Sequence, residues 1–278
     1  MFICNSFRIS KGNFIMNRIW AITKKEWSEV FKNRFVFFTV AFLPLMLTAL
    51  PLGILYATGT SGDILDASMG DLPPQFTTMC GGLNGGECMQ YYIVTQFMLL
   101  FMMVPVIIPI TIASYSIVGE KTTRTLEPLL ATPVTTIELL AGKALAAVTP
   151  AVAATWIGFL LYALGAKLIV VTPAVLYKLI DPLWLMTIFI VGPLLAIAGV
   201  SIAVMISSRV NDPRVAEQIS GIFVLPILAL FIGQTVGFIL IDETFILWMA
   251  VALLFLDGIL LFFATQLFQR ETILTRWK

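Results

Sequence analysis

The stretch Gly119–Lys143, GEKTTRTLEPLLATPVTTIELLAGK, decides how the rest of the chain is interpreted, because it is a polar break between long hydrophobic runs. Pro128 fits the first turn of a short helix, since the N–H that proline lacks would have no helical partner there. Pro133 would end that short helix. Thr135 and Glu138 match the T-x-x-E capping box that starts a new helix. We therefore expect an ordered, amphipathic elbow in this stretch and not a flexible linker.

Composition places the chain in a membrane. The chain is 59% hydrophobic and 12% charged, whereas a soluble domain is about 25% charged. Its mean hydropathy is +0.97, and several apolar runs exceed the roughly 20 residues that cross a bilayer. The expected fold class is all-α: a polytopic membrane protein with six transmembrane helices preceded by an amphipathic interfacial helix.

The expected organisation has one membrane domain with short ends. The parts are an N-terminal extension with the elbow helix (1–34), a single six-helix transmembrane domain (35–268) with an external loop (58–90) and a cytoplasmic loop (119–143), and a tail (269–278). The fifth span is loosened by proline and glycine, so a broken or re-entrant segment is considered there beside a plain crossing.

The segment from Met16 to Arg34 is expected to lie in the plane of the membrane interface. Its apolar residues, tryptophans among them, recur at three- and four-residue spacing, and its basic residues lie largely off that face. This pattern is typical of an interfacial amphipathic helix. Residues 1–15 show little pattern, so Met16 is an alternative start to Met1.

Basic residues predict the orientation. With six spans, all but two of the 17 Lys and Arg residues fall on one side, the exceptions being Lys167 and Lys178. By the positive-inside rule both termini are cytoplasmic, in a multi-pass protein of the cell membrane. Cys80 and Cys88 then lie outside, where they either form a disulfide or remain free thiols.

Residues that the chain lacks exclude several chemistries. The sequence has no histidine, which excludes a Ser–His dyad and an H-E-x-x-H metal site. It also lacks the G-x-x-x-x-G-K-[ST] loop that cradles ATP phosphates. We expect no catalytic residue, no metal site and no cofactor bound by this chain. The net charge of +1 gives no reason to expect a nucleic-acid partner.

The run E-K-x-x-x-T-L-E-P-L-L-A-T-P-V from Glu120, followed by E-L-L-x-G-K from Glu138, resembles the cytoplasmic loop of ABC-2 type permeases. The resemblance implies the permease subunit of an ATP-driven exporter, of the branch that exports sodium or drugs, forming half of the translocation pathway. It also implies three partners: a cytoplasmic ABC ATPase that holds ATP and Mg²⁺, a second permease copy, most simply in a homodimer, and membrane lipid.

The resemblance further implies that the loop docks on the ATPase, with leucines as apolar anchors and paired charges setting the register. A solvated turn that only connects two spans is the alternative. The expected docking residues are Glu120, Lys121, Arg124, Thr125, Leu126, Glu127, Pro128, Leu129, Leu130, Thr132, Pro133 and Glu138. A second cytoplasmic elbow, with Arg209, Asp212 and Arg214, is a weaker candidate for the same role.

Asp257 places a carboxylate inside the sixth span. Such a group is costly in a bilayer, so it should face the bundle interior, a cavity or a partner. It is either a proton or cation site or a structural hydrogen-bonding group. An ATPase-independent channel or cation/proton-coupled carrier that uses Asp257 is therefore the alternative function.

Overall fold

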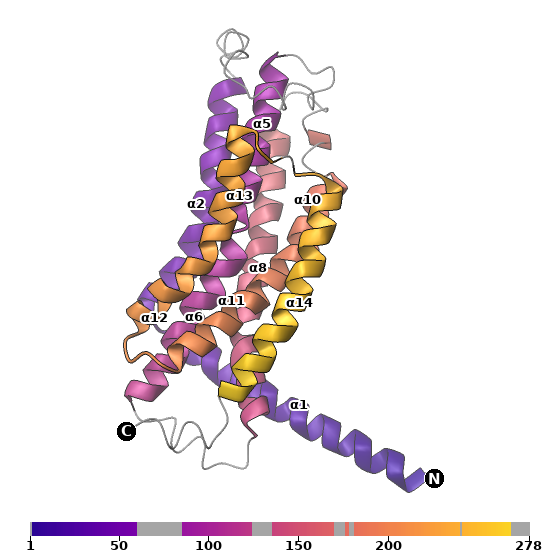
Figure 1. The fold of residues 1–278 in the computed structure, drawn as a ribbon, viewed down its shortest axis with the longest axis vertical. Helices are drawn as coiled ribbons and strands as arrows, with labels where there is room; N and C mark the ends of the chain where they lie inside the picture. The colour runs from indigo at the N-terminus through magenta and orange to yellow at the C-terminus, as the bar shows by residue number, and fades with distance from the viewer. Residues whose placement is uncertain are drawn as a thin grey trace.

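The computed structural model describes residues 2–59, 85–123, 135–169, 176–177, 181–239 and 241–267. In this part of the chain every regular element is helical, and the helices form one elongated bundle (Figure 1). The elements are α1 (Phe2–Val30), α2 (Arg34–Gly59), α5 (Gly85–Phe101), α6 (Val104–Thr122), α8 (Thr136–Ile169), α10 (Pro182–Met186), η2 (Thr187–Val191), α11 (Gly192–Ser207), α12 (Pro213–Ser220), η3 (Gly221–Val224), α13 (Leu225–Val236) and α14 (Glu243–Leu267).

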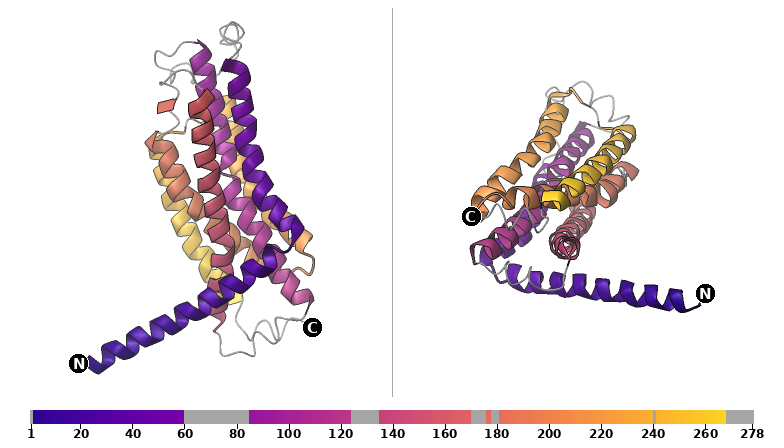
Figure 2. Two further views of the ribbon diagram at one scale, coloured as in Figure 1. Left: turned by 180° about the vertical axis from the view of Figure 1, so that it is seen from behind. Right: turned by 60° about the horizontal axis from the view of Figure 1, so that its bottom comes forward.

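Six helical runs are long and apolar enough to cross a membrane, which confirms the expected all-α, six-span class. They are Arg34–Ala57, Glu87–Thr122, Thr136–Ile169, Pro182–Ser207, Pro213–Val236 and Glu243–Leu267. The amphipathic helix α1 precedes them. It crosses the bundle at one end, and its N-terminal half extends beyond the bundle (Figure 2). We call this the α1 end.

Two helices are longer than the sequence indicated. The cytoplasmic loop was expected to extend to Lys143, and α8, over Thr136–Ile169, begins within that stretch at the predicted capping box. At 1.5 Å per residue it exceeds the roughly 30 Å hydrocarbon core. The helix continues through Lys143, whose side chain is buried. Likewise, the helix that was expected to start at Met16 begins at Phe2.

Helices α6 and α11 form the centre of the bundle, where Ile108, Ile110 and Ile188 are fully buried. Helices α2, α13 and α14 lie outside them and expose large apolar side chains such as Phe38 and Phe255. Exposure of that kind along a whole span is what a lipid-facing helix requires.

The fourth and fifth spans contain irregular turns. The π-helical turn η2 comes directly before Gly192–Pro193, where proline cannot donate to the preceding turn. The 3₁₀ turn η3 interrupts the fifth span. That span nevertheless continues to Gly237, whose φ of 82° ends α13 in the left-handed conformation that glycine tolerates. The fifth span is thus a single helical run with a local break, long and apolar enough for one crossing.

Candidate functional site

The centre of the predicted docking loop, from Arg124 to Pro133, lies outside the described residues, so the docking role of its leucines stays a prediction. The structure does describe both roots of the loop. They are the end of α6 (Gly119–Thr123) and the start of α8 (Thr135–Lys143), and we call them the loop roots. Both roots lie at the α1 end, against α1 (Figure 1).

A buried ammonium group joins the loop roots to α1. Lys143 Nζ, from α8, lies 2.9 Å from Glu26 Oε1 of α1 and 2.7 Å from Glu120 Oε2 of α6. It also donates to Ser116 Oγ at 2.8 Å, and Ser116 in turn donates to Glu26. The side chains of Lys143 and Glu26 are each 3% exposed and that of Glu120 is 6% exposed. One cation therefore connects three helices away from water.

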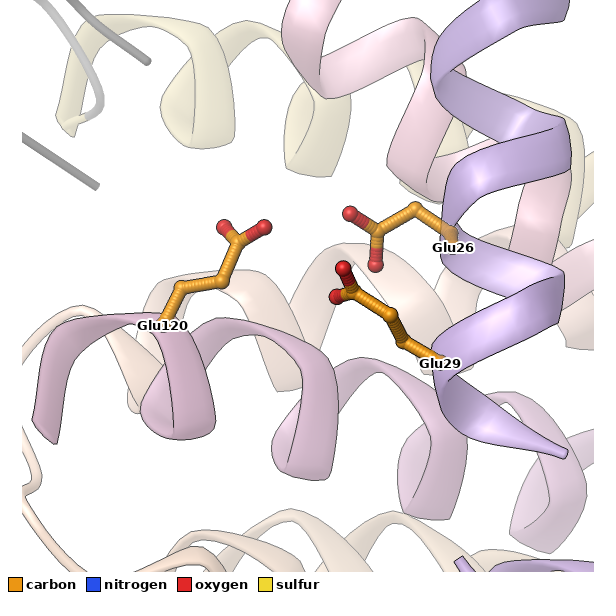
Figure 3. Close-up of side chains that lie close together, drawn as sticks. All are labelled: Glu26, Glu29 and Glu120. Carbon is orange, nitrogen blue, oxygen red and sulfur yellow. The ribbon is translucent and has the colours of Figure 1, made fainter. Parts of the chain in front are cut away.

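A second cation lies at the edge of the same cluster. Lys25 Nζ is 2.6 Å from Glu120 Oε1, 3.4 Å from Glu29 and 3.7 Å from Glu26. Figure 3 shows the three carboxylates of Glu26, Glu29 and Glu120 turned toward one another. Their oxygens lie within 4.8 Å, close enough to share a metal ion. The ammonium of Lys25, which contacts all three, already supplies the positive charge that this group needs.

Two members of the cluster, Glu26 and Lys25, have pKa values shifted toward their charged forms. Burial alone would raise the pKa of Glu26, but the charge of Lys143 and the hydrogen bonds from Ser116 and Lys143 outweigh it and hold that pKa below 4.5. Burial would likewise lower the pKa of Lys25. The hydrogen bond and negative charge of Glu120 dominate, so the pKa of Lys25 lies above 10.5. The attraction between the charges therefore exceeds the cost of their desolvation.

Helix α1 also packs tightly on α8 next to the cluster. Thr23 Oγ1 donates to the carbonyl oxygen of Gly142 at 3.1 Å, and Trp27 Nε1 donates to that of Ala146 at 3.0 Å. A Cβ atom on Gly142 would lie only 2.7 Å from Cγ2 of Ile22. A glycine is thus required at the point where the two helices cross.

The predicted capping box is confirmed at the α8 root. The backbone N–H of Thr135 donates to Glu138 Oε2 at 2.8 Å, and the N–H of Glu138 donates to Thr135 Oγ1 at 3.2 Å. Glu138 also pairs with Arg18 of α1 at 3.7 Å. Two of the three predicted docking carboxylates, Glu120 and Glu138, are buried in the loop roots, where they hold the roots against α1. The third, Glu127, lies outside the described residues.

The second elbow is tied to the first. Lys121, at the end of α6, donates to the carbonyl oxygens of Ser208 and Val210, each at 3.3 Å. Asp212 caps α12 by accepting from the N–H of Arg214 at 2.8 Å. Arg209 and Arg214 are exposed at the same end of the bundle. The described residues among those predicted for the two elbows, Glu120, Lys121 and Glu138 of the first and the three of the second, therefore share one end of the molecule.

Asp257 lies on the buried face of α14, which packs against α11. It is 5% exposed, and neither carboxylate oxygen has a hydrogen-bond partner among the described residues. The expectation that this carboxylate faces the bundle interior is confirmed. Which of its two predicted roles it plays stays open to experiment.

Cys88, at the start of α5, is disulfide-bonded. The predicted partner Cys80 lies outside the described residues, so their pairing remains a prediction.

A model of the ABC-2 family transporter proteins matches residues 20–269. The chain belongs to the ABC-2 family. It is therefore the membrane component of an ABC transporter, a multi-pass integral membrane protein and not itself the ATPase. No curated protein matches the chain closely. In the terms of this family, the cluster around Lys143 is at the base of the permease loop between the second and third spans.

The sequence pattern alone did not identify Glu26 as the partner of Lys143. Glu26 was passed over, although it is three residues after Thr23 and four before Val30 and so falls on the face of α1 that was expected to be apolar. An acidic residue on such a face signals a buried cation nearby. The sequence could not show that this cation comes from a position 117 residues later.

Proposed function

We propose that this ABC-2 permease is the membrane subunit of an ATP-driven exporter and binds its ATPase through the loop between α6 and α8. The observation that carries the proposal is that both loop roots are fastened to α1 by buried charge. A loop that merely connected two spans would not need fixed roots. A surface that receives force from a partner does.

One chain forms only half of the translocation pathway, so the proposed transporter needs a second permease copy. Two copies, most simply identical, enclose the pathway within the lipid bilayer, and two ATPase subunits hold ATP and Mg²⁺ beneath them. The α1 end, with the loop roots and the second elbow, faces the cytoplasm, and both termini are on the cytoplasmic side, as the positive-inside rule predicts. Leu126, Leu129 and Leu130 supply the apolar anchors of the docking surface, and Arg124 and Glu127 set its register.

The direct test is a tagged pull-down from native membranes followed by mass spectrometry. Wild-type chain should recover a nucleotide-binding ATPase, and the double variant Leu129→Asp/Leu130→Asp should lose it, because charged groups cannot enter an apolar docking groove. Leu168→Asp is the matched control. Leu168 is 88% exposed at the opposite end of α8 from the loop root, so this variant should recover the ATPase as wild type does. Undiminished ATPase recovery with the double variant would contradict docking through the loop.

Asp257 favours a second candidate function, an ATPase-independent carrier of protons or cations. Asp257 is buried and has no hydrogen-bond partner within the part of the chain that the structure describes, and an ionisable group at such a position in a membrane is costly and is characteristic of proton and ion pathways. Under this candidate, the purified chain alone in proteoliposomes dissipates a proton or sodium gradient, and Asp257→Asn abolishes that flux. A gradient that the wild-type chain leaves intact rules this function out and leaves Asp257 a structural role.

A further inference from the structure

The buried cluster at the α1 end has a composition that separates it from an ordinary surface ion network. Its inner part consists of two carboxylates, Glu26 and Glu120, around one ammonium group, that of Lys143, which is 4% exposed; Lys25 lies at the edge. Separating Lys143 from these carboxylates is costly, because a charge left alone there would be uncompensated and away from water. The contacts of Lys143 therefore resist separation of α1, α6 and α8.

The surrounding contacts prevent α1 from sliding along α8. Ile22 fits over Gly142 with no room for a Cβ atom. Thr23 donates to the carbonyl oxygen of Gly142 at this crossing, and Trp27 donates to that of Ala146, one turn further along α8. Movement along either helix axis would break both hydrogen bonds and strip Lys143 of Glu26. Packing of this kind permits discrete arrangements and resists gradual deformation.

We infer that Glu26, Glu120 and Lys143 are positioning residues that make α1 and the two loop roots one rigid unit. The inference rests on the proposed function in that the loop receives the movement of the ATPase. When the ATPase displaces the loop, α1 moves with it, and the displacement reaches α6 and α8 together. The elbow helix is then part of the moving element of the transporter and not a passive anchor beside it.

The rigid unit can be tested by dipolar distance measurement between spin labels. Met16 on α1 and Ile157 on α8 are both exposed, at 64% and 59%, and are replaced with Cys for labelling in a Cys4→Ser background. Labelled chains are diluted with unlabelled ones, so that only the distance within one chain is measured in a dimer. In such wild-type complexes in nanodiscs we expect one narrow distance distribution, unchanged between the nucleotide-free and ATP–vanadate-trapped states. Lys143→Met should at least double the width of this distance distribution. Lys143→Arg, which keeps the charge, should give a distribution as narrow as that of the wild type.

Two further variants make the result decisive. Glu26→Gln keeps the size of the side chain and should also broaden the distribution, so the inference stays testable if Lys143→Met fails to fold. Arg18→Met removes the more exposed pair with Glu138 between the same helices and should leave the distribution narrow. A wild-type distance that shifts on vanadate trapping overturns the inference, as does a narrow distribution in Glu26→Gln. Failure of the proposed function would be seen in a different experiment, the pull-down, in which the wild-type chain would recover no ATPase.

Discussion

At the scale of single residues, Glu26 makes the stability of the contact between α1 and the loop roots depend on pH. Its pKa in the folded protein lies below 4.5. A carboxyl group whose pKa is lowered by folding contributes stability above its unfolded pKa and loses it as the pH falls through the folded value. The contribution is therefore complete at pH 7, still present at pH 5, and lost only below about pH 4.5.

Replacing this carboxylate makes the effect measurable. Glu26→Gln should lower stability at pH 7 by up to about 3 kcal/mol, the lower range for a broken buried pair, because Glu120 still pairs with Lys143. Thermal unfolding in detergent between pH 3.5 and pH 7 should show the gap between wild type and variant closing in acid. A gap that is constant across this range would mean that Glu26 does not titrate as its surroundings require.

The same residues show what a sequence can reveal at this scale. The capping box of Thr135 and Glu138 was predictable because its two partners are three residues apart and the bonding pattern is local. The pair of Glu26 and Lys143 was not predictable, because their meeting depends on how three helices cross. Asp257 lies between these cases. Its burial followed from the cost of a charge in a membrane, but only the structure shows that its carboxylate has no hydrogen-bond partner among the residues described.

At the scale of elements, the crossing of α1 and α8 depends on Gly142. Gly142→Ala would place Cβ 2.7 Å from Ile22 Cγ2 and 3.3 Å from the carbonyl oxygen of Ile19, so α1 must move away. We expect a loss of about 1–3 kcal/mol from this overpacking. Combining it with Ile22→Ala should recover part of that loss, as thermal unfolding of the purified variants would show.

Gly119 provides the matched control, because it too is a helical glycine in a loop root. A Cβ atom there meets nothing within 4 Å. Gly119→Ala should therefore raise stability by up to about 1 kcal/mol through helix propensity alone. Equal effects of the two alanine substitutions would show that Gly142 is not a tight contact.

The number of spans was predictable because hydrophobic runs of sufficient length are a property of the sequence itself. Their ends were not, since a helix continues through a charged residue whenever another helix supplies the opposite charge. Lys143 is the example: its charge suggested the edge of the membrane domain, whereas Glu26 and Glu120 allow α8 to run past it. A local sequence pattern cannot predict the end of a helix when that end depends on an ion pair with another helix.

At the scale of the whole molecule, orientation decides whether the α1 end can meet an ATPase. Ile137, at the loop root of α8, is 69% exposed, and Leu168, near the opposite end of the same helix, is 88% exposed. A single cysteine is placed at one position or the other, with the three native cysteines replaced by serine. The two labels then report opposite faces of the membrane from one helix.

We expect a membrane-impermeant maleimide applied to intact cells to label Leu168→Cys and to spare Ile137→Cys until the cells are permeabilised. The reason is electrostatic: almost all of the basic residues that the structure describes lie toward the α1 end, and positively charged segments are retained in the cytoplasm during insertion. Because α8 is continuous from Thr136 to Ile169, the two positions cannot both be outside. The reverse labelling pattern would place Lys143 and the docking loop outside the cell, where there is no ATP, and the exporter assembly would then be untenable.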